Sequence, residues 1–538
     1  MTRTTWADAC RRLGALTLTC VLAMTLLAGC RSKLQEETAV PVNVSYGISN
    51  AWDSFMPYNS VSGSNYARII YDKIYDRLAY VQADGSCLPR GADRWESADD
   101  GYAILFYLNK DAAFHDGTTV TAQHWADTFK LVTDPACPTL GRKIFAGFAG
   151  VDETGAAVEG EPLGVEAVDE FTLKLTFTSP IIPEEFLVDL NRDLYVLPTH
   201  LLQGVAPSDV MNLDLWTKPV GSGPCKFSSE IVGSTLVLEA NPAYQLGKPG
   251  FDTLTITVMD KANLLSAMIA GDLDYYAIGG SVAEDDASVA KEAGFQVQEG
   301  DVASTFYELM LNNETLKSKQ LRQAVELSLD KDLLCQQSVG GLGTPAASSI
   351  LPGSEYDSGE KPAARDLEKA KELLTQAGYA GEIFTLVCTS NRAGIAALVQ
   401  QNLAEAGIRV EIETVDSATM FSGMFDGIYD MAIASHTPNS LPLWFTKTRF
   451  NPDNNLFRVP DLAPYAQRLA AISAATEPDA RKALVADFEA YLADESPFIP
   501  LWFARSLHVE SKTVSGIDHQ AASFSNENVW EWTKKETI

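Results

Sequence analysis

The sequence predicts an α/β protein built from more than one structural unit. A strand-like run at 382–388, an apolar-periodic run at 395–408 and an alternating run at 408–415 form a βαβ pattern, which favours parallel strand pairing. Earlier in the chain, β-prone runs flank short turn sequences, and the DDG at 99–101 is a strong hairpin signal. At 538 residues the chain is longer than one ordinary domain, so we expect about three units.

The N-terminal half alternates strand and helix signals. Residues 40–48 alternate apolar and polar and predict a first strand. Ile69, Ile70, Ile74, Leu78 and Val81 recur at helical spacing and predict a helix that includes all five. A helix capped by Thr121 and a hairpin at 165–178 are expected next.

The middle and C-terminal parts carry clear helix boundaries. Strands are predicted at 235–240, 253–259 and 273–278, with a helix between Asp260 as N-cap and Gly271 just after its end. Further helices are predicted at 318–329, at 330–339 with Asp330 as N-cap, and at 365–379, where Gly378 marks the stop. No tandem repeat is seen.

The charge balance is strongly acidic, with 71 Asp and Glu against 41 Lys and Arg and a formal net charge of −30. Nucleic-acid binding requires clustered basic residues, so the composition argues against that class of partner. It favours solubility and attraction of cationic ligands.

The first residues have the pattern of an export signal. Three arginines precede an uncharged, mostly apolar run from Leu13 to Leu27, followed by LLAGC at 26–30. This order resembles the lipobox of bacterial lipoproteins, which implies a signal peptide at 1–29, lipidation of Cys30 and a polar tether at 30–39. An ordinary buried helix is the alternative. The expected location is therefore the cell membrane, lipid-anchored on its extracytoplasmic face.

Cysteine usage does not predict a metal site. Cys87, Cys137, Cys225, Cys335 and Cys388 are widely spaced and form no CxxC pair, so zinc is not expected. In an oxidising compartment the odd number leaves at least one thiol unpaired, and Cys335 could pair with Cys388.

Catalytic and cofactor motifs are also missing from the sequence. His115 and His124 do not have metal-ligand spacing, the glycine runs do not form a phosphate loop, and there is no GxSxG elbow. Asp272 and Asp274 could be paired catalytic acids. The position of Asp272 directly after Gly271 favours instead an ordinary turn between a helix and a strand. We therefore expect no enzyme activity, no catalytic residue, no metal and no cofactor.

One uncharged stretch is unusual in so acidic a chain. Between Asp430 and Lys447 no side chain carries a formal charge with histidine neutral, and a strand-like start gives way to hydroxyl, amide and aromatic residues. Small-molecule pockets combine aromatic walls with a few placed polar groups, although each aromatic could instead pack in a core. Aromatics near element ends are Trp52, Phe55, Tyr58, Tyr66, Trp444, Phe445, Trp502 and Phe503.

Several motifs, in order along the chain, resemble the extracellular solute-binding proteins of ABC importers, in the family that takes oligopeptides, dipeptides and nickel. They are YDKIYDRLAYVQADGSCLPRGADRWESADDG, LFYLNKDAAFHDGTTVTAQHW, VGSGPCKF, NPAYQLGKPGFDTL, AMIAGDLDYY, LRQAVELSLDKDLL, EKAKELLTQAGY and FIPLWF. The resemblance covers residues 40–538. It departs from the family pattern at Asn109, Gln123, His124 and Cys225.

The resemblance implies an α/β, two-lobed periplasmic-binding-protein-like fold of class II, with an extra α+β domain inserted in the N-terminal lobe. Two chain crossings, near residue 300 and near residue 505, would join the lobes. The implied division is lobe I at 40–65, 207–300 and 507–538, the inserted domain at 66–206, and lobe II at 301–506. FHDG at 114–117 then becomes a turn of the inserted domain.

The resemblance also implies where a ligand binds. Peptide binders of this family hold the ligand as an added strand, with an Asp after the YDM strand taking the amino group. Asn439 occupies that position here, and asparagine lacks the charge that pairs with an ammonium. The turn VSGSNYA at 61–67 could bind a carboxylate through backbone N–H groups, or be an ordinary N-cap. The predicted ligand-binding residues are Tyr58, Ser62, Gly63, Ser64, Asn65, Tyr66, Ser435, His436, Asn439 and Trp444.

The expected function is that of a monomeric, lipid-anchored receptor that captures oligopeptides or dipeptides in an interlobe cleft and delivers them to an ABC permease. The membrane is a partner only through the lipid, and nucleic acid is not a partner. Alternatives are a non-peptide solute such as a nickel complex, a sugar or an opine-like compound, a peptide sensor or chaperone, and, disfavoured, a secreted enzyme on the same fold.

Overall fold

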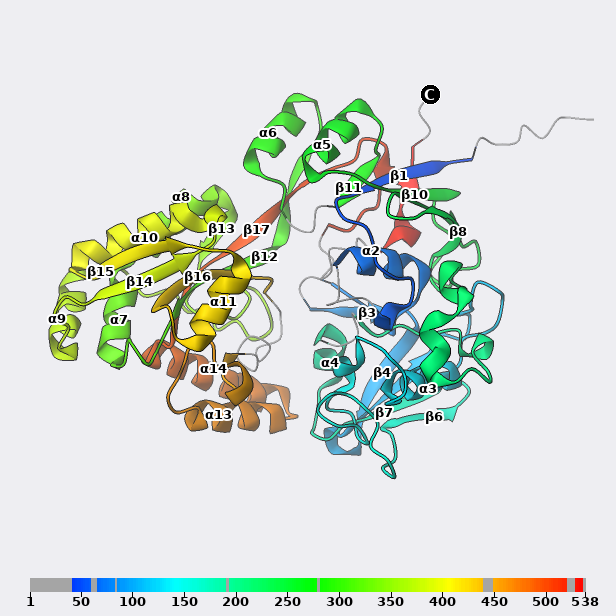
Figure 1. The fold of residues 1–538 in the computed structure, drawn as a ribbon, viewed down its shortest axis with the longest axis horizontal. Helices are drawn as coiled ribbons and strands as arrows, with labels where there is room; N and C mark the ends of the chain where they lie inside the picture. Colours follow the sequence, from blue (N-terminus) through cyan, green and yellow to red (C-terminus); the bar gives the residue numbers. More distant parts are fainter. Residues whose placement is uncertain are drawn as a thin grey trace, which may run out of the picture. The chain divides into compact units, whose positions relative to one another are not determined.

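The structure is a computed structural model that describes residues 41–59, 65–82, 85–189, 193–277, 281–438, 449–519 and 528–535. Within these ranges the strands form three larger sheets, of five, four and six strands, together with two short two-stranded ribbons. Figure 1 follows the chain through them. The predicted signal peptide, tether and Cys30 lie outside the described residues.

The five-stranded sheet combines strands from three separate parts of the sequence. Its order is β11-β1-β10-β9-β8, and β1 lies parallel to both β10 and β11 while β8, β9 and β10 are antiparallel neighbours. The predicted first strand and the two predicted strands that flank residue 245 are confirmed. The bounds are β1 (Asn43–Ile48), β8 (Cys225–Ile231), β9 (Thr235–Ala240), β10 (Thr253–Val258) and β11 (Tyr275–Ala277).

Helix α5 (Lys261–Ala270) connects β10 to β11 and has the ends that the sequence predicts. The Asp260 side chain accepts a hydrogen bond from the Ala262 N–H at 2.9 Å, and Gly271 closes the helix with φ of +85°. Helix α6 (Glu284–Glu292) follows. Leu264, Met268 and Ala290 from these helices share an apolar core with Leu507 and Val509.

The segment after β1 corrects one helix prediction. Helix α2 (Asn65–Ile74) ends at Ile74, and the chain then forms the hairpin of β2 (Ala79–Val81) and β3 (Cys87–Pro89). Leu78 and Val81 are therefore not part of the helix, although both are buried. Buried apolar residues at helical spacing continue past the end of the helix into the hairpin. The pattern of burial alone therefore did not mark the end of the helix.

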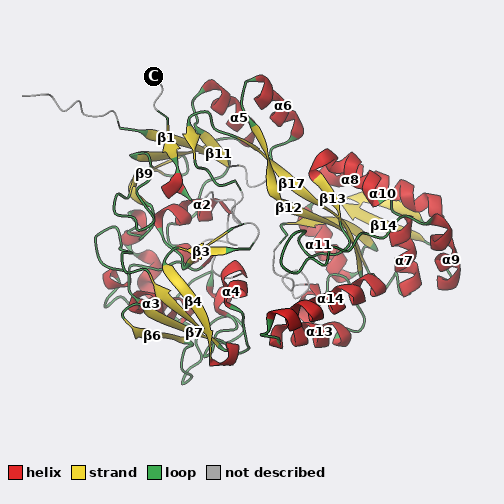
Figure 2. Cartoon of the chain, turned by 180° about the vertical axis from the view of Figure 1, so that it is seen from behind, coloured by secondary structure: helices red, strands yellow, loops and turns green. Residues whose placement is uncertain are grey.

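The four-stranded sheet has the order β4-β5-β7-β6 and is antiparallel throughout. Asp99 and Asp100 turn the chain between β4 and β5 with φ of 52° and 55°, which confirms the predicted hairpin. Helix α3 packs against β6 and β7 (Figure 2), and Thr121 forms a capping box with His124. The bounds are β4 (Ala92–Ala98), β5 (Ala103–Leu108), β6 (Val165–Asp169), β7 (Thr172–Thr176), α3 (Ala122–Thr133) and α4 (Pro183–Asp189).

The six-stranded sheet has the order β13-β17-β12-β16-β14-β15, and it contains the predicted βαβ unit. β14 and β15 pair in parallel around α10, with Leu386 opposite Ile412. The bounds are β12 (Val297–Leu311), β13 (Gly343–Pro345), β14 (Ile383–Cys388), β15 (Arg409–Thr414), β16 (Met431–His436) and β17 (Phe498–Val509).

Two helix layers cover this sheet. One core unites Leu309, Leu386 and Ile433 with helices α7 to α10, and a second unites Phe306, Met310 and Ala432 with helices α11, α13 and α14. The predicted N-cap Asp330 and stop Gly378 are confirmed. The bounds are α7 (Lys319–Ser328), α8 (Lys331–Val339), α9 (Leu367–Ala377), α10 (Ala393–Ala406), α11 (Ser417–Asp426), α13 (Ala463–Ala474) and α14 (Pro478–Glu495).

The long strands β12 and β17 connect the apolar core around α5 and α6 with the core of the six-stranded sheet. They pair antiparallel from Val297↔Val509 at one end to Met310↔Phe498 at the other, with register shifts between. Leu507 and Val509 belong to the core of α5 and α6, whereas Ile499 and Leu501 belong to the core of the six-stranded sheet. Two antiparallel strands therefore pass from one core into the other.

The C-terminal segment returns to the five-stranded sheet. Strands β18 (Val514–Ser515) and β19 (Thr533–Lys534) form a ribbon, and Trp532 is fully buried. Asp274 holds three elements together, because its carboxylate accepts hydrogen bonds from the Ser45 N–H, the Thr513 hydroxyl and the Lys534 ammonium at 2.6–2.7 Å.

The cysteines correct the suggested disulfide. Cys87, Cys137, Cys225, Cys335 and Cys388 are all free thiols, so Cys335 and Cys388 do not pair. Cys335 is on α8 and packs toward Gly343 of β13, whereas Cys388 ends β14. In the strand order, β17, β12 and β16 separate β13 from β14, which keeps the two thiols apart.

Candidate functional site

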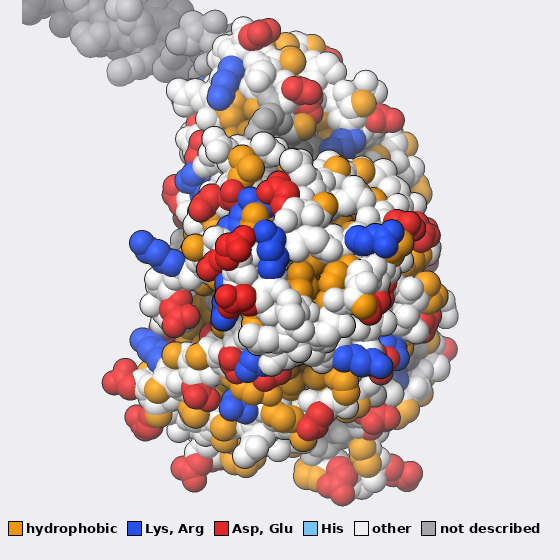
Figure 3. Space-filling model, turned by 90° about the vertical axis from the view of Figure 1, so that its left-hand side faces the viewer, with side chains coloured by type: hydrophobic (Ala, Val, Ile, Leu, Met, Phe, Trp, Pro, Cys, Tyr) orange, Lys and Arg blue, Asp and Glu red, His pale blue; other side chains and the backbone are white. Residues whose placement is uncertain are grey.

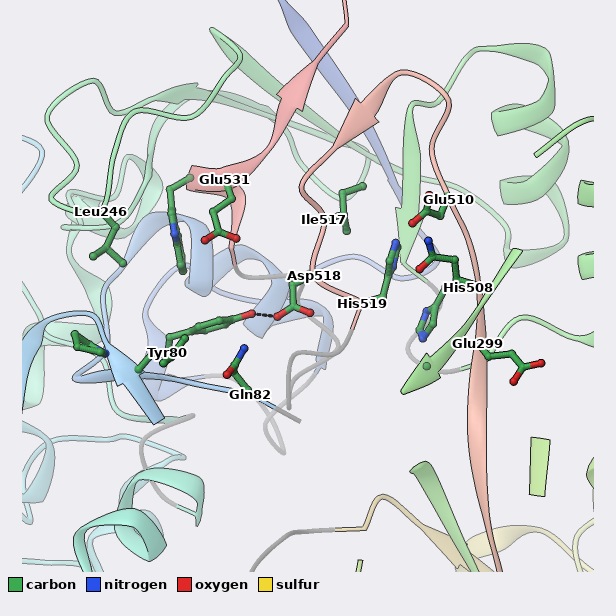
Figure 4. Close-up of a pocket in the computed structure, with 15 residues that line it drawn as sticks. Tyr80, Gln82, Leu246, Glu299, His508, Glu510, Ile517, Asp518, His519 and Glu531 are labelled. Carbon is green, nitrogen blue, oxygen red and sulfur yellow. Dashed lines mark hydrogen bonds between the residues drawn. The ribbon is translucent and has the colours of Figure 1, made fainter. Parts of the chain in front are cut away.

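A pocket of about 630 Å³ lies beside β12 and β17, where these strands leave the five-stranded part of the fold. Figure 4 shows its walls, which come from the β2–β3 hairpin, the two long strands and the C-terminal segment. The lining residues are Tyr80, Gln82, Leu88, Pro89, Leu246, Gln298, Glu299, Gly300, His508, Glu510, Ile517, Asp518, His519, Trp530 and Glu531. Volumes of this size suit small-molecule ligands.

Two neutral histidines form part of the wall. The rings of His508 and His519 stack with centroids 5.0 Å apart. His508 contacts the Ser506 hydroxyl at 2.6 Å, and His519 contacts the Tyr275 hydroxyl at 3.0 Å. Burial lowers the pKa of both rings, and burial together with His508 lowers the pKa of His519 to about 4. Both are therefore uncharged at neutral pH.

The charged part of the wall is acidic. Glu299 pairs with Arg505 at 2.9 Å, Asp518 accepts a hydrogen bond from the Tyr80 hydroxyl, and Glu531 accepts one from the Asn528 amide at 2.8 Å. Glu510 is a fourth carboxylate, and none of the described lining residues is a lysine or arginine.

A second group of polar residues meets at one edge of the six-stranded sheet. β14 and β16 run parallel, with Leu386 opposite Met431, so their carboxyl ends share that edge. Arg392 lies just after β14, and its guanidinium donates a hydrogen bond to the Ser435 hydroxyl near the end of β16 at 2.5 Å. Ligands of α/β sheets bind at carboxyl edges of this kind.

His436, the last residue of β16, faces a buried carboxyl group. Its Nδ1 atom lies 3.8 Å from Oε1 of Glu308, and Arg449 lies 4.0 Å from the same oxygen. Burial raises the pKa of Glu308 to about 7 against the opposing effect of Arg449. Burial, with Arg449 and Arg392, lowers the pKa of His436 to about 3. At neutral pH His436 is uncharged and able to accept or donate hydrogen bonds.

The structure brings two of the ten predicted ligand-binding residues together at this edge, Ser435 and His436. Tyr58 is 1% exposed, and its hydroxyl bonds to the backbone of Tyr195 at 2.7 and 3.0 Å, so it packs inside the fold. Tyr66 is half-buried and contacts the Ser49 hydroxyl at 2.5 Å. The ligand contacts of all four remain predictions.

The other predicted residues fall largely outside the described part of the chain. Asn65 begins α2, but its side chain is not described. Ser62, Gly63, Ser64, Asn439 and Trp444 lie outside the described residues.

Sequence reasoning missed Arg392, Glu308 and the pocket residues. The sequence could have indicated Glu308, because it is the single charged residue in the apolar run Phe306–Leu311. The pocket had no such signal, because Tyr80 comes from a chain segment more than 400 residues away from the one that carries His508 and His519. Within the described ranges no cluster of three or more His, Cys, Asp or Glu could hold a metal ion. No helix there is long and apolar enough to span a bilayer.

Comparison with known proteins defines the class. The family model of the bacterial extracellular solute-binding proteins, family 5, matches residues 88–456. Because the match covers more than half of the sequence, the chain belongs to this family, the substrate-binding proteins of ABC importers.

Individual relatives agree with this assignment. The periplasmic oligopeptide-binding protein OppA of Haemophilus influenzae is 24% identical over 478 residues, which span 84% of this chain and 86% of OppA. The ABC transporter substrate-binding protein CtaP of Listeria monocytogenes has the same fold, with a TM-score of 0.78, 20% identity and coverage of 92% of this chain and 99% of CtaP. The periplasmic murein tripeptide-binding protein MppA, in an unliganded open form, gives 0.75 at 21% identity, with coverage of 92% and 98%.

Proposed function

We propose that this chain is the lipid-anchored substrate-binding component of an ABC importer that captures oligopeptides or dipeptides and delivers them to a membrane permease. The observation that carries the proposal is the pocket of about 630 Å³ beside β12 and β17. Its wall combines aromatic and apolar surface with a few placed polar groups, as small-molecule sites do.

The polar groups suit a ligand that carries both charges. The pocket presents carboxylates, and Arg392 presents a guanidinium at the carboxyl edge of β14. A short peptide has an ammonium at one end and a carboxylate at the other, so both groups would find a partner of opposite charge. The name of the relative OppA, an oligopeptide-binding protein, supports the same class of ligand.

The proposed mechanism is closure of two lobes on the ligand. We assign lobe I to 40–65, 207–300 and 507–538, the inserted domain to 66–206 and lobe II to 301–506. The five- and four-stranded sheets fall within the first and second of these assignments. The six-stranded sheet falls within 301–506 except for the ends of β12 and β17, which extend to Val297 and Val509 and supply the connection. A ligand that contacts both lobes binds the closed form better than the open form and so shifts the population toward it.

Anchoring and delivery complete the proposal. Acylation of Cys30 would tether the monomer to the extracytoplasmic face of the membrane, with 30–39 as a polar spacer. The permease is the expected protein partner. Metabolic labelling with a clickable fatty acid tests the anchor: label should attach to the wild type and be lost in Cys30→Ala.

A thermal-shift screen of peptides, amino acids, sugars and nickel complexes tests the ligand class, because a ligand of the folded state raises the midpoint of unfolding. We expect short peptides to give the largest shifts and deletion of the protein to abolish their uptake. Turnover of a substrate by the purified protein would overturn the proposal in favour of an enzyme. Peptide binding without any loss of uptake on deletion would favour a sensor or chaperone.

A non-peptide solute is the second candidate. It is favoured by Asn439, which stands where the family resemblance expects the ammonium-binding Asp. If peptides are the ligands and this register is right, Asn439→Asp should tighten binding of peptides with a free amino group. Equal affinity of both proteins for such peptides would contradict the assigned role of Asn439.

A further inference from the structure

An ion pair joins α4 to α14, two helices that the assignment above places in the inserted domain and in lobe II. The guanidinium of Arg481 on α14 contacts the carboxylate of Glu185 on α4. The side chain of Arg481 is 1% exposed and that of Glu185 is 13% exposed, so both charges are largely shielded from water. The pair therefore connects the two sides of the molecule through side chains, in addition to the crossing strands β12 and β17.

Lobe II by itself holds the Arg481 side chain in place. Its Nη1 atom donates hydrogen bonds to the carbonyl oxygens of Ile472 and Ala475, at 3.1 and 3.3 Å, at the end of α13. A cation is favourable there, because the last carbonyl groups of a helix point toward it. Burial lowers the pKa of Arg481 to about 10, so the guanidinium is still charged at neutral pH. Within the described residues no carboxylate of lobe II pairs with it, and Glu185 supplies the counter-charge.

Two further contacts lie around the pair. A Cβ atom placed on Gly101, in the turn between β4 and β5, would be 3.4 Å from the Thr476 side chain in the link from α13 to α14. The turn and the link are therefore within van der Waals distance of each other. Burial, then Glu355 and then Glu184 of α4 raise the pKa of Tyr356 to about 12, which places the α4 carboxylate near this loop of lobe II. The ion pair thus belongs to a wider contact between the two sides.

The pair contributes free energy only to a conformation in which α4 and α14 touch. When the lobes move apart on β12 and β17, Arg481 keeps its two carbonyl contacts and loses its counter-charge. Separating the partners of a shielded ion pair is costly, because the remaining charge is left without compensation. A contact that is made in one conformation and broken in the other shifts the population toward the first.

We propose that Arg481 and Glu185 form a latch that holds the inserted domain against lobe II and so favours the closed form of the receptor. The inference rests on the lobe closure of the proposed function and assigns a residue pair to that step. The latch acts through the conformation and needs no contact with the ligand. It therefore raises the affinity for every ligand of the closed form without selecting among them.

Pulsed electron paramagnetic resonance on the full-length protein, with no peptide added, tests the latch. The spin labels are attached to p-acetylphenylalanine in place of the exposed residues Lys130 on α3 and Gln376 on α9, which leaves the native thiols unmodified. Helix α9 lies on the side of lobe II that Figure 3 views, so its label does not disturb the contact with α4. The distance between the labels reports the separation of the inserted domain from lobe II.

Glu185 is the residue to change, because Arg481 also stabilises the end of α13. Glu185→Gln removes the charge and keeps the size of the side chain, and the ratio of the short-distance to the long-distance population should fall about tenfold. Glu185→Lys places a second cation beside Arg481 and should lower the ratio further. Glu166→Gln, on an exposed position of β6 in the same domain, is the control and should keep the wild-type ratio. A wild-type ratio in both Glu185 variants, or an equal fall in the control, would overturn the inference.

Addition of trialanine separates failure of the latch from failure of the proposed ligand class. A peptide ligand should increase the short-distance population of the wild type. If trialanine changes no population while Glu185→Gln still opens the protein, the latch is supported and the peptide ligand is not. If trialanine closes the wild type but Glu185→Gln matches the wild type before its addition, the peptide ligand is supported and the latch is overturned.

Discussion

The Nδ1 atom of His436 lies 3.8 Å from Oε1 of Glu308, across the β12–β16 pair of the six-stranded sheet. Glu308 is fully buried, and neither of its carboxyl oxygens forms a hydrogen bond with any described residue. An ionised carboxylate in such a place is costly, so burial raises the pKa of Glu308 to about 7. Strand β16, which ends at the candidate site, therefore lies beside a carboxyl group whose ionisation destabilises the fold. Strongly shifted pKa values of this kind are common at functional sites.

Glu308→Gln should stabilise the protein in a pH-dependent way. In the unfolded chain the carboxyl has its ordinary pKa of 4.5, while the folded chain keeps the proton up to about pH 7. As pH rises from 4.5 to 7 the unfolded state releases a proton that the folded state retains, so the wild type loses stability across that window. Glutamine lacks this loss, and the variant should gain about 3 kcal/mol at pH 8 and almost nothing at pH 4.

Urea denaturation at pH 4 and pH 8 measures this difference. Glu411→Gln, on the exposed face of β15, is the matched control and should differ little from the wild type at either pH. A Glu308→Gln protein with the same advantage at both pH values would contradict the proposed cause.

Much of the local structure was predictable because it depends on neighbouring residues. Asp260, Gly271, Asp330 and Gly378 mark helix ends through contacts within one turn, and the βαβ unit follows from periodicity. The boundary after Ile74 was missed, because Leu78 and Val81 stay buried while the backbone changes from helix to strand. Hydrophobic spacing reports burial and does not by itself report the backbone conformation.

The candidate site was less predictable because its parts meet only in the folded chain. Ser435 and His436 were found from an uncharged strand end, but the partners Arg392 and Glu308 come from β14 and β12. The stacked pair of His508 and His519 also depends on tertiary contacts, since each histidine alone matches no motif. Sequence reasoning located the strand and could not supply the groups that other strands bring to it.

Asp274 should be essential for stability rather than for chemistry. Its carboxylate joins β1, β19 and the segment at Thr513, so Asp274→Ala removes three hydrogen bonds and leaves the Lys534 ammonium with the Asn43 carbonyl oxygen but without its carboxylate partner. We expect the free energy of unfolding to fall by about 2–5 kcal/mol.

The neighbouring carboxylate provides the control for this prediction. Asp272 is exposed, and Asp272→Ala should change stability by less than about 0.5 kcal/mol in the same urea titration. Equal effects of the two substitutions would show that the three contacts of Asp274 contribute little.

Arg392 should govern recognition of the ligand carboxylate if peptides are the ligands. Its guanidinium is held at the carboxyl edge of β14 by the Ser435 hydroxyl, and it can pair with a carboxylate through two N–H groups. For a peptide found in the thermal-shift screen, Arg392→Ala should weaken binding by about 10- to 100-fold. The amidated form of that peptide should lose far less, because it lacks the charge.

Calorimetric titration of both peptide forms with Arg392→Ala and with Arg409→Ala separates the specific effect from a general one. Arg409 is exposed on β15 of the same sheet, so its substitution should leave both affinities unchanged. Equal weakening of the free and amidated peptides by Arg392→Ala would assign Arg392 to the scaffold instead.

The free thiols should differ sharply in their reactivity toward iodoacetamide. Cys87 is half-buried, whereas Cys137, Cys225, Cys335 and Cys388 are buried. Burial raises the pKa of Cys225 to about 12 and that of Cys335 to about 11, so little thiolate forms at neutral pH even when reagent reaches them. Peptide mapping of native protein should show Cys87 modified at least tenfold faster than the buried four, which react only after local or global opening. In guanidinium chloride all five should react, and a Cys335–Cys388 cross-link under non-reducing conditions would contradict the structure.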